Sequence, residues 1–406
     1  MEEAIIILGA GVAGMAAAKL LAGGGHRVVL VDRSFSPVAQ AGHLHVLLGR
    51  GQQLLGEQFP EVYRRICAEC PEVNWGDEIY WRSPAGPLPK RALDVSTRLL
   101  GRAYLDRLLA EELENLPGCE LVTGSIQSLK LSPDRSLVTS VTLADGRELG
   151  CSHCIDSLGR GSRTRQQLES LFSVRVRTDE IRTALRYFSF DARLRGETEF
   201  RQVYYQIDPQ TERFGGVISP VGGDRLIATF ISIDRDFQPA GNPFHLIPDE
   251  VFQRFVDQVE FAPGHRAFGQ LHNRRHRYEK FRQLPSNLFL IGDSFCQFNP
   301  VFGQGMTVAL ESAALLAKFV SGAKTGSGSL GFQAQLARSI RFPWMISTMD
   351  PYNQDAGRNW SQRATRALMH RVMGRCRESP ETHRSLVRAL HMLDHPRELL
   401  KLRNLI

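Results

Sequence analysis

The chain has 406 residues, of which 42% are hydrophobic and 23% charged, a composition typical of a globular protein of two to three domains. Its net charge of +7 is concentrated from residue 331 onward, where twelve arginines and one lysine face six acidic residues, so the first 330 residues are neutral overall. No apolar run reaches the length of a membrane span, so the composition excludes a transmembrane segment.

The start of the sequence and its cysteines predict a cytoplasmic protein. An apolar strand begins at residue 4, which leaves no room for a signal peptide ahead of it. Seven cysteines without an export signal favour free thiols over a disulfide framework. Cys67/Cys70 and Cys151/Cys154 have the CxxC spacing of a zinc site. Because Cys154 falls in an expected buried strand, we favour small core residues and predict no metal site.

The first segment predicts a dinucleotide-binding unit. Residues 4–8 form an apolar strand, and Gly9, Gly11 and Gly14 give a GxGxxG turn that opens a helix. Gly9 permits the tight turn, Gly11 lets the backbone approach a pyrophosphate, and Gly14 lets helix and strand pack closely. A second strand, residues 28–31, ends at Asp32, where the dinucleotide fingerprint places a carboxylate against a ribose hydroxyl. We therefore expect FAD or NAD, which share the same ADP half.

The next segments alternate between helix and strand patterns. The sequence predicts helices over 46–59 and 104–116, loops with short strands over 72–91, a strand over 120–122, and a hairpin over 143–148 that turns at Asp145-Gly146. The core sheet is thus expected to be assembled from pieces far apart in sequence.

Residues 175–285 consist of alternating, β-rich runs joined by Gly, Pro and Asp turns. Such runs predict an antiparallel sheet with one face packed and the other lining a site, so we interpret this region as an inserted substrate domain. Aromatic residues in these runs either line an apolar pocket or fill the core. Tyr204, Tyr205, Phe214 and Phe230 are the candidates, and we predict Tyr204, Phe214 and Phe230 as pocket residues.

Residues 288–311 carry the most information about the ligand. An apolar strand over 288–291 runs into Gly292 and Asp293, and a turn from Pro300 to Gly305 then opens a helix of small and apolar residues. A carboxylate at a strand end beside a helix N-terminus suits a ligand with both a polyol and an electron-rich ring. Flavin is such a ligand, so this block favours FAD over NAD.

The C-terminal part is expected to be helical and basic. The composition of residues 322–331 predicts a flexible linker. Within residues 360–375, helical spacing puts Ala364, Ala367, Leu368 and Val372 on one stripe and Arg363, Arg366 and His370 elsewhere. We interpret this helix as a cap with a solvated basic face. The alternative is a docking surface for an acidic carrier protein with a tethered substrate, or for an anionic membrane.

Several matched stretches, in the right order, give the chain a family resemblance. It resembles the FAD-dependent monooxygenases of the para-hydroxybenzoate hydroxylase fold, and most of all the 2-polyprenyl-6-methoxyphenol hydroxylase-like branch, which includes flavin epoxidases of polyether pathways. The stretches are GAGVAG at 9–14, HLHVLLGRG at 43–51, GRAYLDRLL at 101–109, IDSLGRGSRTRQQL at 155–168, RRHRYE at 274–279 and GDSFCQFNPVFGQGM at 292–306. They cover about residues 1–320.

The resemblance implies an α/β (mixed α+β) fold in three parts. A Rossmann-like FAD-binding domain would be assembled from the discontinuous segments 1–70, 98–172 and 286–322. A substrate domain with an inserted antiparallel β-sheet would comprise residues 71–97 and 173–285, and a C-terminal helical region residues 331–406.

The resemblance also implies the cofactor site. Asp32 should hold the adenosine ribose, Arg102 should reach the phosphate or ribityl region, and Asp293 should accept a hydrogen bond from the ribityl chain. Backbone N–H groups and the helix dipole near the isoalloxazine ring would favour negative charge on the reduced flavin. The full set of expected FAD contacts is Gly9, Gly11, Gly14, Asp32, Arg33, Arg102, Ile126, Asp156, Asp293, Pro300, Gly303, Gln304, Gly305 and Met306.

The implied reaction is oxygen insertion through a flavin C(4a)-hydroperoxide. The protein would exclude water, and the distal oxygen would pass by epoxidation or hydroxylation to a mostly apolar, electron-rich small molecule, in secondary metabolism. The alternatives are Baeyer–Villiger insertion by the same peroxide, an O₂-independent flavin reductase or dehydrogenase, and a flavoprotein without turnover.

Three further expectations follow from the resemblance. His43 and His45 lie on a segment that the family brings to the flavin, so they are candidates for a proton donor or a cofactor contact, although a lone histidine is more often structural. Asp156-Ser157 stands where aromatic hydroxylases have Asp-Gly, and this departure argues against direct reduction by NAD(P)H. The expected electron donor is NAD(P)H or, as a partner, a separate flavin reductase. The substrate is a small molecule, free or tethered to a carrier protein, and no nucleic-acid partner is expected.

Overall fold

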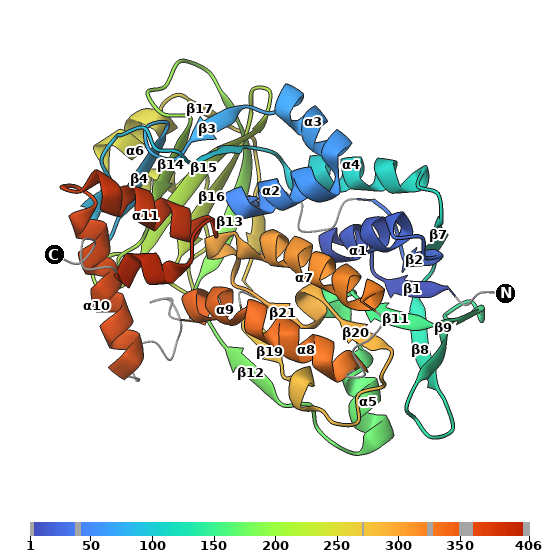
Figure 1. Ribbon diagram of the computed structural model, residues 1–406. Coiled ribbons are helices and arrows are strands. Elements are labelled where there is room, and N and C mark those ends of the chain that lie inside the picture. The colour runs from blue at the N-terminus through green and yellow to red at the C-terminus, as the bar shows by residue number, and fades with distance from the viewer. Residues whose placement is uncertain (1–3, 37–41, 270–271, 323–327, 349–359, 401–406) are drawn as a thin grey trace.

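The fold is described from a computed structural model, which covers residues 4–36, 42–269, 272–322, 328–348 and 360–400 (Figure 1). The helices of this part are α1 (Val12–Gly23), α2 (Gly49–Gln58), α3 (Pro60–Glu69), α4 (Arg102–Glu114), α5 (Thr164–Phe172), α6 (Glu250–Val256), α7 (Gln304–Ser321), α8 (Gly328–Ser339), α9 (Arg341–Thr348), α10 (Trp360–Arg375) and α11 (Pro380–Leu390).

The strands fall into five sheets. They are β1 (Ile5–Leu8), β2 (Val28–Asp32), β3 (Glu72–Asn74), β4 (Ile79–Ser83), β5 (Gly86–Pro87), β6 (Ser96–Arg98), β7 (Cys119–Thr123), β8 (Ile126–Leu131), β9 (Val138–Leu143), β10 (Glu148–Gly150), β11 (His153–Asp156), β12 (Thr178–Ile181), β13 (Arg186–Leu194), β14 (Gln202–Tyr205), β15 (Phe214–Gly222), β16 (Arg225–Ser232), β17 (Val259–Phe261), β18 (Arg266–Phe268), β19 (Asn273–His276), β20 (Leu288–Leu290) and β21 (Cys296–Gln297).

A five-stranded parallel sheet with the order β20-β11-β1-β2-β7 forms one half of the molecule. All four residues of β1 are buried, as expected for a parallel strand covered on both faces. Each such isoleucine or leucine contributes roughly 1.5–3 kcal/mol to folding through burial of its side chain. Because the strands come from the beginning, the middle and the later part of the chain, the predicted fold class with its discontinuous Rossmann-like domain is confirmed.

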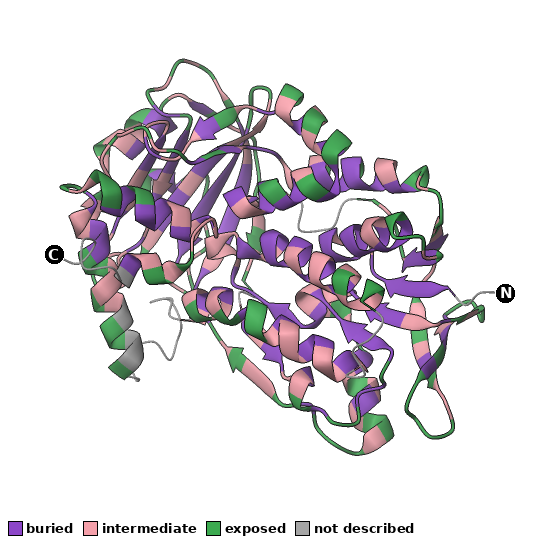
Figure 2. Cartoon of the chain, viewed as in Figure 1, coloured by how far each residue is buried: buried purple, intermediate pink, exposed green. Residues whose placement is uncertain are grey.

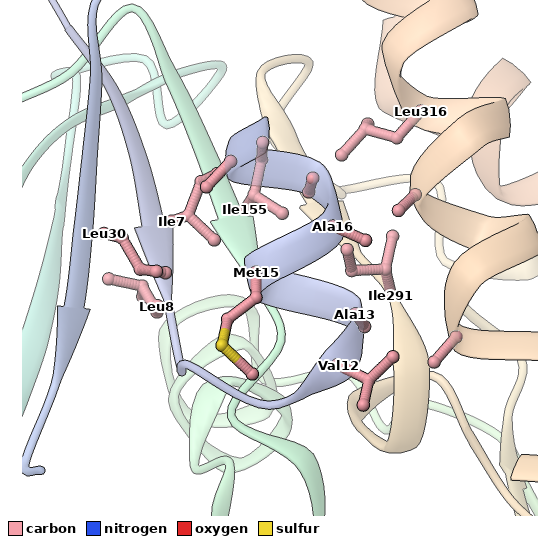
Figure 3. Close-up of a cluster of buried hydrophobic side chains, with 14 of the residues drawn as sticks. Ile7, Leu8, Val12, Ala13, Met15, Ala16, Leu30, Ile155, Ile291 and Leu316 are labelled. Carbon is pink, nitrogen blue, oxygen red and sulfur yellow. The ribbon is translucent and has the colours of Figure 1, made fainter. Parts of the chain in front are cut away.

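Helix α1 lies between this sheet and α7 (Figure 3). It also contacts α4. Ala16, Ala17 and Ala18 are fully buried, and their small side chains let the helix approach both the sheet and α7. Ile155 of β11 and Ile291 after β20 pack into the same cluster. The N-terminal segment and residues 288–321 thus share one core, as the sequence predicted.

A second, three-stranded antiparallel sheet consists of β8, β9 and β10. Strands β9 and β10 form the hairpin predicted at Asp145-Gly146, and Gly146 has φ +89°, a conformation that favours glycine.

The other half of the molecule is an eight-stranded sheet with the order β17-β13-β16-β15-β14-β4-β5, and β18 pairs with β13. Its pairs are antiparallel except that between β14 and β4. One face packs on α6 through an aromatic cluster that includes Phe190, Phe230, Phe244 and Phe252. Figure 2 shows that the middle strands of this sheet are buried. The predicted antiparallel insertion is confirmed.

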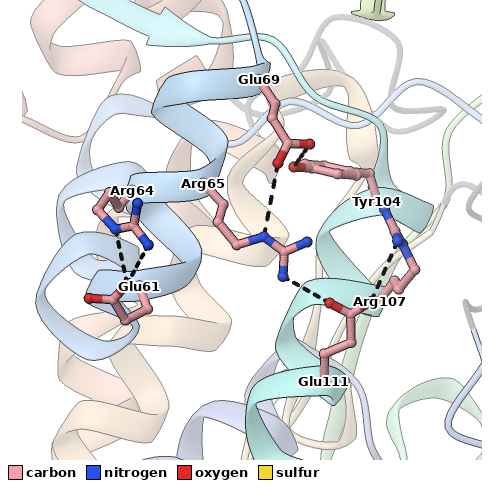
Figure 4. A network of polar contacts seen from close by, with 7 residues as sticks. All are labelled: Glu61, Arg64, Arg65, Glu69, Tyr104, Arg107 and Glu111. Atoms are coloured by element: carbon pink, nitrogen blue, oxygen red, sulfur yellow. Dashed lines mark hydrogen bonds and ion pairs between the residues drawn. The ribbon is translucent and has the colours of Figure 1, made fainter.

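Helices α3 and α4 are joined by a polar network (Figure 4). Arg65 lies 2.9 Å from Glu111 and 3.9 Å from Glu69, and the Tyr104 hydroxyl donates to Glu69 at 2.7 Å. The arginine and both glutamates remain substantially exposed. Water therefore screens these pairs, and the network orients the two helices more than it stabilises them.

The predicted linker is wrong for residues 328–331, which form the first turn of α8. Ser329 is fully buried, its N–H donates to Ser286 O at 2.9 Å, and its Oγ donates to Pro285 O at 2.6 Å. These contacts fix a segment whose composition alone favours flexibility. Residues 323–327, the rest of that prediction, lie outside the described residues.

The predicted helix over 360–375 is confirmed as α10, which packs on α11 in a small core of its own. Of the predicted apolar stripe, Val372 is buried and Leu368 half-buried, whereas Ala364 and Ala367 are exposed. The stripe is therefore only partly a packing surface.

His391, directly after α11, ties the end of the chain to α2. Its Nδ1 accepts a hydrogen bond from the Gly49 N–H at 3.0 Å, and its carbonyl accepts one from the Arg50 N–H at 3.1 Å. The first N–H groups of a helix have no partner within the helix, so they need acceptors from elsewhere. His391 supplies acceptors for two of them in α2. Burial lowers the pKa of His391 to about 3, so the imidazole is neutral and Nδ1 is the acceptor.

The described residues include no helix that is both long and apolar enough to cross a bilayer. All seven cysteines lie in the described part and are free thiols. Cys154 is fully buried in β11, as the core interpretation predicted.

We expect His391 to make the protein less stable in acid. An unfolded histidine takes up a proton near its ordinary pKa of 6.5, whereas His391 stays neutral in the folded protein down to about 3. Its contribution is complete above pH 6.5 and is lost as the pH falls through that window. The substitution His391→Asn keeps an acceptor for Gly49 but removes the titration. Thermal unfolding measured against pH should therefore be flatter in this variant, and an unchanged slope would contradict the assignment.

Candidate functional site

The carboxyl ends of β1, β2, β11 and β20 meet at one edge of the parallel sheet. Here the Ala10 N–H donates to Asp32 Oδ2 at 2.6 Å, and the Gly159 N–H donates to Ser294 Oγ at 2.8 Å. Crevices at this edge are where open α/β sheets bind ligands. The structure therefore brings the two separated sequence motifs to one place.

The glycines of the first turn have different surroundings. Gly9 has φ +100°, and a Cβ there would lie 2.6 Å from Ser157 O. A Cβ at Gly14 would lie only 1.9 Å from Gly9 O, so this glycine is required for packing of α1 on the turn. A Cβ at Gly11 would meet no heavy atom within 4 Å. The space beside Gly11 fits a pyrophosphate held against the backbone.

Helix α1 begins without a side-chain cap. Its first N–H groups therefore remain able to bind an anion, and the helix dipole favours negative charge there. Asp32 also accepts from the Ser34 N–H at 3.2 Å, which orients the carboxylate at the end of β2. Arg33 is exposed beside it, and Ile126 is half-buried at the first residue of β8.

Asp293 lies between two arginines. Arg160 Nε is 3.7 Å from Asp293 Oδ2, and Arg102, paired with Asp106 at 2.6 Å, is near enough to act on the same carboxyl. Burial raises the pKa of Asp293, and both arginines oppose that rise. Although the carboxylate is surrounded by protein, its side chain is 41% exposed because it opens on the crevice. This is a suitable place to accept a hydrogen bond from a ribityl hydroxyl.

Asp156 is fully buried and serves the architecture of the crevice. Its Oδ1 accepts from the Leu158 N–H at 2.9 Å and from Ser294 Oγ at 2.8 Å, and its Oδ2 accepts from Ser162 Oγ at 2.5 Å. Asp156 was itself predicted to contact FAD, but its carboxylate lies in the protein interior and joins β11 to the residues after β20. Ser157 lies 2.8 Å from the carbonyl oxygens of Leu8 and Gly9 and holds the glycine turn.

The turn before α7 completes the crevice. Gly303 has φ +63° and packs against Val46, and α7 begins with no side-chain cap. A Cβ at Gly305 would meet nothing within 4 Å, which leaves room for a flat ring. Gln304 is buried and its Oε1 has no hydrogen-bond partner among the described residues, and Met306, two positions later, is also buried. The residues present therefore fit FAD along the whole crevice.

A cavity of about 660 Å³ adjoins this turn. Its wall includes Pro300, Val301, Phe302 and Gly303 from the turn, and Val217, Thr229 and Ile231 from the eight-stranded sheet. Of the predicted pocket aromatics, Tyr204 lines the cavity, 5.7 Å from the ring of Trp81. Phe214 and Phe230 do not: they pack on each other and on Phe237 in the aromatic core on the opposite face.

His43 and His45 both line the cavity, next to the turn before α7. His43 Nδ1 is 2.9 Å from Ser189 Oγ, which is 2.9 Å from Thr229 Oγ1, another cavity residue. Burial, and to a lesser extent Arg266, lowers the pKa of His43, so the ring is neutral at pH 7. A neutral imidazole can both give and take a proton.

The C-terminal helices close the cavity, which the sequence did not predict. Residues missed in this wall are Trp75 and Trp81 from the β3–β4 segment, Arg363, Arg366, Met369 and His370 from α10, and Leu390 and His391 from the end of α11. Arg363, Arg366 and His370, which were expected on a solvated face, therefore line this cavity. The one sequence signal was the cluster of arginines in residues 360–375.

Solved structures with the same fold belong to proteins that are named for different activities. PqsL of Pseudomonas aeruginosa, named a probable FAD-dependent monooxygenase, superposes with a TM-score of 0.63 at 19% identity over 95% of this chain and 99% of its own. The Diels-Alderase PyrE3 gives a TM-score of 0.66 at 18% identity, covering 97% and 81% of the two chains, and the halogenase PltM gives 0.67 at 16%, covering 99% and 86%. These likenesses show the fold alone, which is that of para-hydroxybenzoate hydroxylase, as predicted.

Two curated relatives come from Mycobacterium tuberculosis. Protein Rv3254 of strain H37Rv is 22% identical over 380 residues, which are 86% of this chain and 80% of the relative. Menaquinone reductase of strain CDC 1551 / Oshkosh is 25% identical over 337 residues, which are 78% of this chain and 76% of the relative.

We expect Gly11→Ala to lower FAD affinity by at least about tenfold, a change of about 1.4 kcal/mol, without lowering the melting temperature of the apoprotein. Its Cβ would collide with the cofactor, since beyond the adjacent backbone no atom of the described residues lies within 4 Å. Gly14→Ala is the contrasting variant. Its Cβ would lie 1.9 Å from Gly9 O, so overpacking should cost at least roughly 1–3 kcal/mol of stability. Flavin titration and thermal unfolding of both variants check this, and equal affinity in Gly11→Ala would refute the pyrophosphate placement.

The family profile described as FAD binding domain matches residues 2–332, most of the chain. This range contains the glycine turn, Asp293 and the turn before α7, which the structure assembles into one crevice. The chain therefore belongs to the FAD binding domain family and is a flavoprotein.

Proposed function

We propose that the protein is an FAD-dependent monooxygenase that inserts one oxygen atom from O₂ into a mostly apolar, electron-rich small molecule. Epoxidation or hydroxylation is the proposed outcome, with Baeyer–Villiger insertion as a variant of the same chemistry. In each case one oxygen atom enters the substrate and the other leaves as water, which consumes two electrons and two protons. The proposed setting is secondary metabolism in the cytoplasm.

One observation carries the proposal. The cavity that would hold the substrate is bounded by the turn from Pro300 to Gly303, and this same turn opens the helix whose N-terminus borders the FAD crevice. A substrate in the cavity would thus lie beside the position predicted for the isoalloxazine ring. Shared walls of this kind hold two reactants at a short distance, which is a large part of the work of catalysis.

The residues of the chain supply position, dryness and charge, while bound FAD supplies activation of O₂. Trp81, Tyr204, Ile231 and Phe302 give the cavity an apolar wall that excludes water. The uncapped first turn of α7 favours negative charge at its N-terminus. His43 is held at its Nδ1 by Ser189, so its neutral ring can hold or pass a proton at the edge of the cavity.

The electron donor proposed is NAD(P)H or a separate flavin reductase. Ser157 supports a separate flavin reductase. It occupies the space between β11 and the glycine turn, at a position where aromatic hydroxylases have glycine. Delivery of the substrate by an acidic carrier protein remains part of the proposal, since part of α10 is exposed and basic.

A second candidate is O₂-independent electron transfer to a quinone. The relative named menaquinone reductase favours it, because it matches 78% of this chain at 25% identity. The cavity is also apolar enough to admit a quinone ring.

The two candidates differ in what oxidises the reduced protein. We expect the FAD-loaded, dithionite-reduced protein to reoxidise in air-saturated buffer with O₂ uptake, and to release H₂O₂ more slowly than free reduced FAD does, because the cavity excludes water. Stopped-flow absorbance with an oxygen electrode and a peroxide assay measures both. Rapid anaerobic reoxidation by menadione together with negligible O₂ uptake would favour the quinone reductase instead, and failure to take up FAD would exclude both.

We expect His43→Ala to raise the rate of H₂O₂ release from the reduced protein in air-saturated buffer several-fold, since it opens the wall beside the predicted ring and removes the Nδ1 contact with Ser189. His43→Asn keeps an atom near the position of Nδ1 and should show a smaller increase. His45→Ala, on the same segment, is the parallel test for the other candidate histidine. The rate of peroxide release after the dithionite-reduced protein is mixed with O₂ is the measurement, and an unchanged rate would remove the residue from the site.

A further inference from the structure

The cationic side chains of the cavity wall are not equivalent. Arg160 is engaged with Asp293 at 3.7 Å, and its guanidinium lies 5.4 Å from the centre of the Phe268 ring. Arg366 projects from α10 into the same wall, on the side of the cavity formed by the C-terminal helices. Its Nε is buried and has no hydrogen-bond partner among the described residues.

The acidic residue that shares this wall does not serve Arg366. Asp208 lines the cavity, and its Oδ1 accepts from the Gln210 N–H at 3.1 Å, within its own turn. A guanidinium N–H that is withdrawn from water without a partner costs free energy. A ligand anion would supply that partner, and guanidinium binds carboxylate and phosphate oxygens through paired N–H groups.

We propose that Arg366 binds an anionic group, a carboxylate or a phosphate, at one end of the substrate. The rest of the substrate is apolar and aromatic, because most of the exposed surface of the cavity is apolar and its wall includes Trp75, Trp81 and Tyr204 together with aliphatic side chains such as Val217 and Ile231. The ligand is therefore amphipathic: its ring lies toward the flavin turn and its charge lies at α10. This inference rests on the proposed function for the identity of the cavity as the substrate site.

A matched pair of fluorescent probes tests it without turnover. 8-Anilino-1-naphthalenesulfonate and N-phenyl-1-naphthylamine share one aromatic skeleton and differ by the sulfonate. We expect the FAD-loaded protein to bind the anion more tightly. Arg366→Gln should weaken the anion by about tenfold, as for loss of a hydrogen bond to a charged group, and change the affinity for the neutral probe less than about twofold. Arg366→Lys should restore part of the difference.

Arg371→Gln is the matched control, since it removes the same charge from an exposed position of α10 outside the cavity wall. It should leave both probes unchanged. A second arm displaces the neutral probe with 2-naphthoate, 2-naphthyl phosphate or 2-naphthol, and at least one of the two anions should outcompete the alcohol only when Arg366 is present.

Equal weakening of both probes by Arg366→Gln would show a packing role and overturn the proposal, as would equal effects of Arg366→Gln and Arg371→Gln. Thermal unfolding confirms that each variant is folded. Because the titration requires no O₂ or reductant, its failure would leave the monooxygenase proposal standing, and failure of the oxygen experiment would leave the anion site standing.

Discussion

The whole architecture depends on how closely the Gly9 turn approaches the end of β11. Ser157 and Leu158 occupy the space where any side chain on Gly9 would lie, and Gly14 brings the first turn of α1 onto the carbonyl of Gly9. This contact joins the N-terminal unit to segments more than a hundred residues later. Because Asp156 then binds Ser294, the same contact extends to β20 and Asp293. A cofactor crevice made of distant segments is the result of that single close packing.

The cavity is built on a different principle. Its walls are supplied by regions that lie far apart in the sequence, including the segment of His43 and His45, the turn before α7, one face of the eight-stranded sheet, and helices α10 and α11. The turn before α7 also borders the FAD crevice, and the sheet gives an apolar surface. The C-terminal helices supply cationic groups and a neutral histidine, His391. The border with the FAD crevice, the apolar surface and the cationic groups of the cavity thus come from separate parts of the chain.

Much of the crevice was predictable from sequence because its signals are local. Two short segments carry these signals: the glycine turn up to Asp32, and the block around Asp293. Each combines a strand, a turn and a helix, and such patterns constrain the backbone directly. The C-terminal wall was not predictable, because neither the arginines of α10 nor His391 reveal which distant surface they face. The segment from Gly328 was misread for the same reason, since Ser329 is fixed by contacts with Pro285 and Ser286.

The sheet aromatics show the limit of periodicity. Tyr204 and Tyr205 are neighbours on β14, yet Tyr204 lines the cavity while Tyr205 belongs to the aromatic core. Phe230 is likewise in the core, between Thr229 and Ile231 of the cavity wall. Alternation indicates that the strand has two faces. Which face meets α6 and which meets the cavity is decided by tertiary packing.

The arrangement of His391 has a consequence for the order in which the protein matures. A ribosome completes the flavin crevice, up to α7, well before it produces α10 and α11, and domains generally fold in that order. The nascent chain can therefore bind its cofactor before α10 and α11 have supplied their wall of the cavity. Exchange of the last helices between homologous genes would then change one wall of the cavity and leave the FAD crevice untouched, provided that the residue after α11 still engages the start of α2.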